Sequence, residues 1–110
     1  MTQDTAMEVR RAGDGTGVIE IRGDITAASE DALMDAYGEV AGEPRVILDF
    51  GHVDYINSTG IAVIVGILAE ARKNGQELQA AGLAEHYREI FRITRLSDFM
   101  TILDDGGARP

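Results

Sequence analysis

A chain of 110 residues with 45% hydrophobic and 26% charged side chains has the composition of one globular domain with its own core. Its net charge of −9 disfavours nucleic acid and anionic membrane surfaces as partners, and favours a protein with a basic face. Most of this charge lies in residues 1–54, which carry 12 acidic against 4 basic side chains. Without cysteine, a signal-peptide core or a membrane-length apolar run, the chain is expected to be soluble and cytoplasmic.

The first two elements are predicted to form a β-hairpin. Met7–Arg11 and Gly17–Arg22 are short segments, and the second is rich in β-branched residues. Between them, Gly13-Asp14-Gly15 is typical of a turn. Gly23–Thr26 is expected to follow the second strand as a loop.

A helix is expected next, with Thr26 able to cap its start. Glu30 and Asp31 lie near the first turn, where acidic side chains interact favourably with the helix dipole. The helix should end near Gly42, because Pro44 cannot continue it. Four residues recur at helical spacing and are expected to face the core: Leu33, Ala36, Tyr37 and Val40.

The central part of the chain contains one ambiguous segment. Arg45–Phe50 predicts a buried strand, because four of its six residues are large and apolar. Ile61–Leu68 is so rich in β-branched residues that propensity alone favours another strand. Length and end signals instead favour a helix over Thr59–Asn74, because Asn57 or Ser58 can cap it and a glycine follows it. This helix is apolar nearly all round, so much of it should be buried, with any uncovered face available to a partner.

Three shorter elements complete the chain. Glu77–Ala81 is expected to be a strand, Glu85–Thr94 a helix and Phe99–Leu103 a final strand. The side chains of this last helix that are expected to point inward are Tyr87, Ile90, Phe91 and Thr94.

The predicted order of elements is β-β-α-β-α-β-α-β. Such alternation predicts an α/β fold whose sheet is mostly parallel, with right-handed crossovers and one antiparallel strand from the N-terminal β-hairpin. No internal repeat or linker divides the sequence. Residues 1–110 are therefore expected to form a single domain, with a core over about 7–104 and a tail over 105–110.

Functional groups are expected beyond the carboxyl ends of the parallel strands. Gly23–Thr26 follows one strand and Gly51–Asn57 follows another, so Asp24, Asp54 and Ser58 share one rim if those strands are neighbours. Hydroxyl groups at a helix start lie beside unpaired N–H groups, where a phosphate is favoured. Two interpretations stay open: Ser58 is a phosphorylation site, or the residues at this position only cap the helix.

Catalytic and metal-binding patterns are weak. His52, Asp54 and Ser58 are the residue types of a hydrolase triad, but no Gly-x-Ser-x-Gly elbow is present, so an enzyme is not expected. His52 is interpreted as a polar loop residue and His86 as part of a helix start, and two such distant histidines predict no metal site. Asp24 either bonds nearby backbone N–H groups or contacts a partner.

The segment Asp54–Gly66, with Gly23–Thr26 upstream and Val46–Asp49 between, resembles the STAS domain of bacterial anti-sigma factor antagonists. The resemblance spans roughly Val9–Leu103. It implies a regulatory, non-enzymatic protein whose unphosphorylated form binds an anti-sigma factor with serine kinase activity, and so releases a sigma factor. A serine phosphatase would reverse the phosphorylation. ATP and metal belong to those enzymes, so the resemblance implies no cofactor for this chain.

The resemblance places the phosphorylated residue at Ser58. Asp24 matches the acidic position of a glycine-acidic loop that is associated with partner contact in the family. The residues expected to contact the partner are Asp24, Thr26, Asp54, Asn57, Ser58, Thr59 and Gly60. The family commonly has aspartate where this chain has Asn57, which leaves the preference of the kinase open.

Other interpretations remain beside this one. A STAS protein can be a scaffold in a stress-signalling complex, or a stand-alone relative of the domain found on sulfate-type anion transporters. A different class is a small hydrolase or nucleotide-binding enzyme, whose turnover or nucleotide binding Ser58→Ala would abolish. The sequence leaves open whether Thr59 can substitute for Ser58 and whether the chain forms a homodimer.

Overall fold

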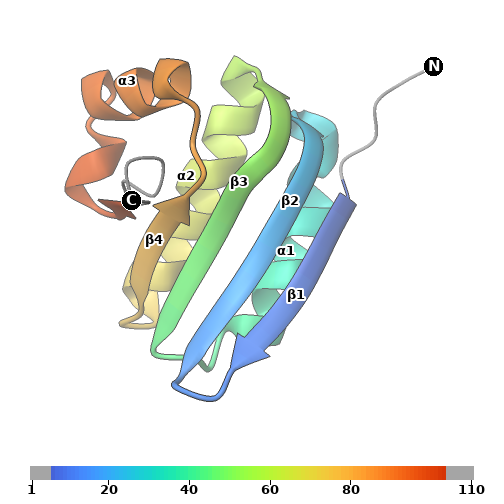
Figure 1. Cartoon of the computed structure of the whole chain (residues 1–110), viewed down its shortest axis with the longest axis vertical. Coiled ribbons are helices and arrows are strands. Elements are labelled where there is room, and N and C mark those ends of the chain that lie inside the picture. Colours follow the sequence, from blue (N-terminus) through green and yellow to red (C-terminus); the bar gives the residue numbers. More distant parts are fainter. Residues whose placement is uncertain (1–5, 104–110) are drawn as a thin grey trace.

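A computed structural model describes residues 6–103, in which a five-stranded sheet packs against helices (Figure 1). Its elements in chain order are β1 (Ala6–Ala12), β2 (Thr16–Ile25), η1 (Ala27–Ser29), α1 (Glu30–Val40), β3 (Arg45–Ile56), α2 (Ser58–Lys73), β4 (Glu77–Ala81), α3 (Glu85–Ile93), η2 (Leu96–Asp98) and β5 (Thr101–Ile102). The predicted order is confirmed, and the two short 3₁₀ turns η1 and η2 are additional to it.

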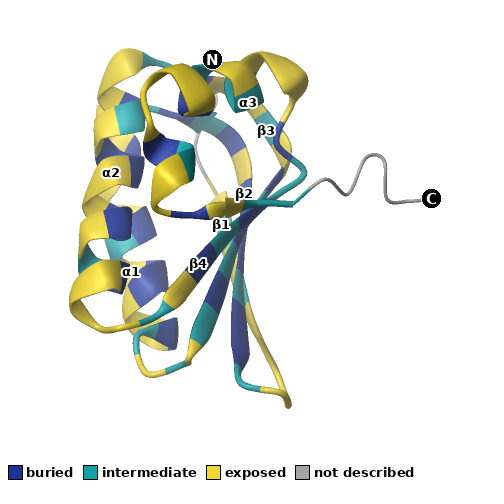
Figure 2. Ribbon diagram, turned by 90° about the vertical axis from the view of Figure 1, so that its left-hand side faces the viewer, coloured by how far each residue is buried: buried dark blue, intermediate teal, exposed yellow. Residues whose placement is uncertain are grey.

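The strands lie in the order β1-β2-β3-β4-β5. β1 is antiparallel to β2, and every other neighbouring pair is parallel, as the alternation of elements predicts. α1 and α2 lie side by side on one face of the sheet, while no described helix covers the other face of β1, β2 and β3 (Figure 2). The apolar core lies between the sheet and these two helices, and it also includes Phe91 of α3 and Leu96 of η2.

The helical interpretation of the ambiguous central segment is confirmed. The inner face of α2 is formed by Gly60, Val63, Ile64, Ile67, Leu68 and Ala71. These positions repeat every three or four residues, so its β-branched side chains pack on the sheet as a helix stripe. Burying each large aliphatic side chain contributes about 1.5–3 kcal/mol, which outweighs the small helix propensity deficit of β-branched residues.

The predicted core face of α1 is also confirmed, because Leu33, Ala36, Tyr37 and Val40 are all buried. Its start differs in detail. Thr26 caps the 3₁₀ turn η1, which leads directly into α1, and the first turn of α1 holds Glu30 and Asp31 as expected.

Two predicted loops are wrong, because both belong to strands. Gly23–Thr26 lies in β2 as far as Ile25, and Gly51–Asn57 lies in β3 as far as Ile56. The two strands continue to pair with each other beyond the end of β4, with Ile25 opposite Ile56. The register shifts between Gly23 and Asp24, and the positive φ of 89° at Gly23 suits a glycine there.

The C-terminal predictions need correction. The final strand covers only Thr101–Ile102, because Arg95 adopts a left-handed conformation and η2 redirects the chain before it. Phe99 lies outside the strand and packs under the Arg72 guanidinium, 4.7 Å from the ring centroid. Thr94 is exposed rather than inward, and its hydroxyl donates to Ile90 O. The predicted tail, 105–110, lies outside the described residues.

Candidate functional site

The predicted functional residues meet at the carboxyl ends of β2 and β3. These strands are neighbours, and Asp24 pairs in register with Tyr55, directly after Asp54. α2 begins at Ser58, two residues after β3 ends. The structure therefore brings Asp24, Asp54 and Ser58 to one end of the sheet, the upper end in Figure 1.

The helix cap at this rim is Asn57. Its backbone is extended, and its Oδ1 accepts hydrogen bonds from Gly60 N–H at 2.7 Å and from the Thr59 hydroxyl at 2.8 Å. Asn57 N–H donates to Ile25 O at 3.2 Å, which ties the cap to the end of β2. Of the two residues that the sequence offers as a cap, Asn57 thus fills the role, and Ser58 is the first residue of the helix.

Gly60 allows the first turn of α2 to approach β2. A Cβ atom at this position would lie only 2.0 Å from Ile25 O and 2.6 Å from the carbonyl carbon. Backbone atoms cannot give way at such a distance, so only glycine fits without moving the helix. Gly60 is buried, and it serves the site by fixing where α2 begins.

The two hydroxyls of the helix start differ in their engagement. Ser58 is exposed, and its hydroxyl makes no hydrogen bond to any residue within 6–103. Thr59 is exposed too, but its hydroxyl already donates to Asn57 Oδ1. The Ser58 hydroxyl is thus the more accessible of the two, and it lies beside the N–H groups at the positive end of α2.

Thr26 and Ser29 shape the turn that follows Asp24. The Thr26 hydroxyl oxygen accepts from Ala28 N–H at 3.2 Å, and Thr26 N–H donates to the Ser29 hydroxyl oxygen at 2.9 Å. Ser29 is buried and also donates to Asp24 O at 3.2 Å. Sequence reasoning missed Ser29, although a reciprocal cap of two hydroxyl residues three apart is a recognisable signal.

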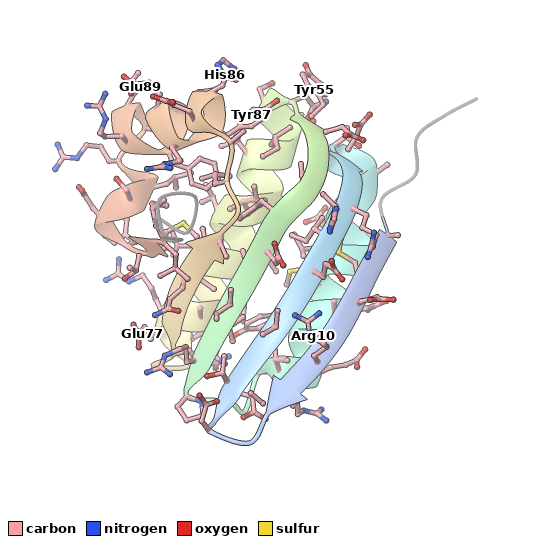
Figure 3. All side chains as sticks on the ribbon, in the orientation of Figure 1. Arg10, Tyr55, Glu77, His86, Tyr87 and Glu89 are labelled. Atoms are coloured by element: carbon pink, nitrogen blue, oxygen red, sulfur yellow. The ribbon has the colours of Figure 1, made fainter. Side chains whose placement is uncertain are left out.

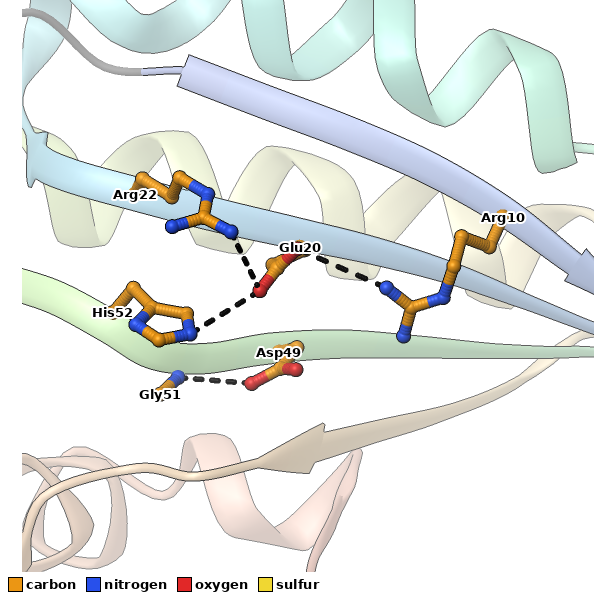
Figure 4. A network of polar contacts seen from close by, with 6 residues as sticks. All are labelled: Arg10, Glu20, Arg22, Asp49, Gly51 and His52. Atoms are coloured by element: carbon orange, nitrogen blue, oxygen red, sulfur yellow. Dashed lines mark hydrogen bonds and ion pairs between the residues drawn. The ribbon is translucent and has the colours of Figure 1, made fainter.

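His52 does not join the rim. It lies in β3 rather than in the predicted loop, and its Nε2 is 3.3 Å from Glu20 Oε2 on the uncovered face of the sheet (Figure 4). Glu20 is only 9% exposed and is also approached by Arg22 at 3.3 Å and Arg10 at 3.7 Å. The geometry therefore pairs His52 with a carboxylate, and gives Ser58 no histidine base.

Tyr55 is a surface residue that sequence reasoning did not single out. Its side chain is 52% exposed at the end of β3 beside the Ser58 turn (Figure 3). Large exposed aromatic side chains are frequent anchors of protein interfaces. Its position between Asp54 and Asn57 in the sequence was the available signal.

The uncovered face of α2 begins at Ser58. With 3.6 residues per turn, Ala62, Val65 and Ala69 lie on the same face as Ser58, and all are exposed. Val65 is 41% exposed, a large value for a valine. The expectation that part of this apolar helix stays accessible is confirmed.

The described residues contain neither a metal-binding cluster nor a membrane-spanning helix. Within 6–103, no cluster of three or more histidine, aspartate or glutamate side chains is arranged to hold a metal ion. None of the helices over the same residues has the length and apolarity needed to cross a membrane.

Several known proteins are similar to this chain. A sequence model of the family described as "Mlab, STAS domain" matches residues 8–104. The anti-sigma-B factor antagonist of Staphylococcus aureus is 30% identical over 103 residues, which cover 92% of this chain and 86% of that protein. BtrV of Bordetella bronchiseptica, provisionally named an anti-sigma factor antagonist, is 33% identical over 98 residues, covering 87% and 82%.

A solved structure shares the fold. The Bacillus cell fate determinant SpoIIAA in its phosphorylated form superposes with a TM-score of 0.70 at 15% identity. The match covers 94% of this chain and 96% of that one. At this identity the likeness concerns the arrangement of helices and strands.

Proposed function

This chain belongs to the STAS domain family, and from that premise we propose that it is an anti-sigma factor antagonist. Its unphosphorylated form binds an anti-sigma factor that has serine kinase activity, and this binding releases a sigma factor. Phosphorylation of Ser58 by the bound kinase ends the interaction, and a serine phosphatase restores it. The names of the Staphylococcus and Bordetella relatives support the first part of this proposal.

The accessibility of Ser58 is the observation that carries the proposal. Its hydroxyl is exposed and makes no hydrogen bond within residues 6–103, whereas the hydroxyl of Thr59 is held by Asn57. A kinase can therefore reach the Ser58 oxygen without breaking an internal contact. The structural neighbour SpoIIAA is described in a phosphorylated form, which further supports modification of this fold.

A phosphate at Ser58 is expected to act on binding more than on folding. It adds about −1.5 to −2 charges, and the N-terminus of α2 favours such an anion by roughly 0.3–1 kcal/mol. Repulsion from Asp24 and Asp54 opposes this gain, while the cap Asn57 is neutral and adds no repulsion of its own. A partner that buries Ser58 would have to desolvate the dianion, at a cost of about several kcal/mol.

The surface around Ser58 indicates what kind of partner face fits. Asp24 and Asp54 are acidic, and residues 1–54 carry most of the negative charge of the chain. Tyr55 and Val65 offer apolar contact beside the serine and along the exposed face of α2. We expect a partner surface with an apolar centre and a basic rim, which electrostatic complementarity would steer onto this end of the domain.

No catalysis by this chain is part of the proposal. The serine is the acceptor of a phosphoryl group, and the kinase supplies the nucleotide and metal. His52, the only histidine near enough in sequence to suggest a triad with Ser58, pairs with Glu20 instead.

A pull-down from the native cell extract tests the proposal. Wild type and Ser58→Ala are expected to retain a kinase-like anti-sigma protein, and Ser58→Asp is expected to lose it. Thr101→Val is the matched control, because it removes an exposed hydroxyl on β5, away from the Ser58 end of the sheet, and should leave retention intact. If all these baits retain the same non-kinase partners, the switch is wrong and a scaffold role replaces it.

A further inference from the structure

β3 extends beyond its neighbour β4 at the end that leads to Ser58. The last register pair between these strands joins Asp49 to Ala81, whereas β3 continues through Ile56. On its other side, the extension still pairs with β2, where Ile25 lies opposite Ile56. On the β4 side of this extension, backbone N–H groups therefore have no neighbouring strand whose carbonyl oxygens could accept their hydrogen bonds.

α3 supplies an acceptor in place of that strand. The Tyr87 hydroxyl oxygen accepts a hydrogen bond from Ile56 N–H at 3.0 Å. One turn later, Phe91 packs edge-to-face on Phe50 of the same strand, with the ring centroids 6.0 Å apart. Figure 3 shows Tyr87 between α3 and the upper end of β3. α3 thus covers the extension and also satisfies its last backbone donor.

Two hydrogen bonds, one of them to the Tyr87 hydroxyl, hold the residues that precede α2. Ile56 is tied to α3, and the next residue, Asn57, donates its N–H to Ile25 O of β2 at 3.2 Å. Asn57 Oδ1 in turn accepts from Gly60 N–H at 2.7 Å. Hydrogen bonds therefore link α3 with the first turn of α2 through only two residues of the chain.

We propose that Tyr87 is a positioning residue for Ser58. Its hydroxyl fixes the end of β3 and, through the Asn57 cap, the direction in which the Ser58 side chain leaves α2. The inference rests on the proposed role of Ser58 as phosphoryl acceptor. It makes α3 part of the switch, because any change that separates α3 from β3 also changes how Ser58 is presented.

The test compares two tyrosine-to-phenylalanine variants of the full chain. Tyr87→Phe removes only the hydroxyl that accepts from Ile56. Tyr37→Phe is the matched control, because it removes a buried hydroxyl at the opposite end of the domain, where it accepts from Asn74 Nδ2 at 2.8 Å. The Tyr37 hydroxyl also hydrogen-bonds with Gln76, so the control loses two hydrogen bonds and its general loss of stability should be at least as large as that of Tyr87→Phe.

Amide hydrogen exchange measured by NMR is the first readout. In Tyr87→Phe, the exchange rate of Ile56 N–H is expected to rise roughly tenfold, and the amide signals of residues 57–60 are expected to shift. Tyr37→Phe should leave both unchanged. Unchanged exchange at Ile56 in Tyr87→Phe, or an equal response of residues 56–60 in the two variants, would overturn the positioning role.

The rate of Ser58 phosphorylation in native cell extract supplied with ATP is the second readout. Where wild type is phosphorylated, the rate is expected to fall in Tyr87→Phe by more than in Tyr37→Phe, and equal rates in the two variants would overturn the role. The two proposals are distinguishable because the NMR measurement needs no partner. If the amides respond to Tyr87→Phe but even wild type is not phosphorylated at Ser58, the positioning of the turn is supported and the proposed switch is wrong.

Discussion

The two ends of the sheet differ in whether their polar side chains are hydrogen-bonded inside the domain or exposed. At the end where the parallel strands begin, Gln76 Nε2 donates to Val40 O at 2.9 Å and to Glu43 O at 2.8 Å. Tyr37, which is buried, also hydrogen-bonds with Gln76 and accepts from Asn74. This network, the Gln76 network, satisfies the polar groups of the helix ends internally.

At the opposite end, where β2 and β3 end and α2 begins (the Ser58 rim), the side chains of Ser58 and Tyr55 are exposed. The Ser58 hydroxyl has no hydrogen-bond partner within 6–103, and Tyr55 is half exposed. The groups that define where α2 begins, Asn57 and Gly60, are engaged internally. One end therefore stabilises the domain, while the other fixes the start of α2 and leaves the Ser58 hydroxyl exposed.

The largest effect is expected from filling the space at the Ser58 rim. Gly60→Ala places a methyl group against Ile25 O and should reduce the free energy of unfolding by about 3 kcal/mol, in addition to moving the start of α2. Urea denaturation measures the change. Gly66→Ala on the same helix is the control, since nothing lies within 4 Å of its Cβ and alanine should be neutral or stabilising. Equal stabilities of the two variants would contradict the close approach.

A smaller loss is expected at the other end. Gln76→Ala leaves the Val40 and Glu43 carbonyls without this donor and should reduce stability by about 2 kcal/mol. Because the Gln76 network is remote from Ser58, retention of the partner in a pull-down should be unchanged at a temperature where the variant is folded. Loss of partner binding by the folded variant would contradict the inference that the Gln76 network stabilises the domain without affecting the Ser58 end.

The cap at the rim is expected to contribute about 1 kcal/mol. Asn57→Ala removes the acceptor for Gly60 N–H and for the Thr59 hydroxyl, so thermal unfolding should occur at lower temperature. Ser58→Ala removes a hydroxyl that has no hydrogen-bond partner within 6–103, and should leave the unfolding temperature nearly unchanged. If Ser58→Ala were the more destabilising of the two, Ser58 rather than Asn57 would be the cap.

The smallest effect concerns pH at the end opposite the rim. Hydrogen bonds from Gln79 and Arg45 hold the pKa of the exposed Glu77 carboxyl below its ordinary value of 4.5. Because the folded pKa is the lower one, this contribution to stability is present above pH 4.5 and is lost as the pH falls through the folded pKa. Thermal unfolding followed over acidic pH should therefore show a slightly weaker pH dependence for Glu77→Gln than for wild type.

The helices were more predictable from sequence than the strand ends. α2 has capping and stop signals separated by four turns, and these outweigh the strand propensity of Ile61–Leu68. Gly23–Thr26 and Gly51–Asn57 contain glycine and polar residues and therefore look like loops. They are mostly strand because β2 and β3 pair with each other there, which is a tertiary effect that local sequence does not encode.

The candidate site was predictable in its location but not in its hydrogen bonds. Parallel neighbouring strands place Asp24, Asp54 and Ser58 at one end, and the sequence pattern contains that information. Which residue caps α2 depended on side-chain geometry. The bond from Ile56 to Tyr87 joins residues 31 apart in the chain, so no local pattern indicated it.

Protein stoichiometrically phosphorylated at Ser58 separates an effect on recognition from an effect on folding, when partner affinity and thermal unfolding are measured on the same sample. We expect the affinity for the captured anti-sigma factor to fall by about 100-fold or more, equivalent to roughly 2.7 kcal/mol, while the unfolding temperature changes by only a few degrees. A large loss of thermal stability with unchanged partner affinity would contradict the proposed switch, because Ser58 would then act on folding instead of on recognition.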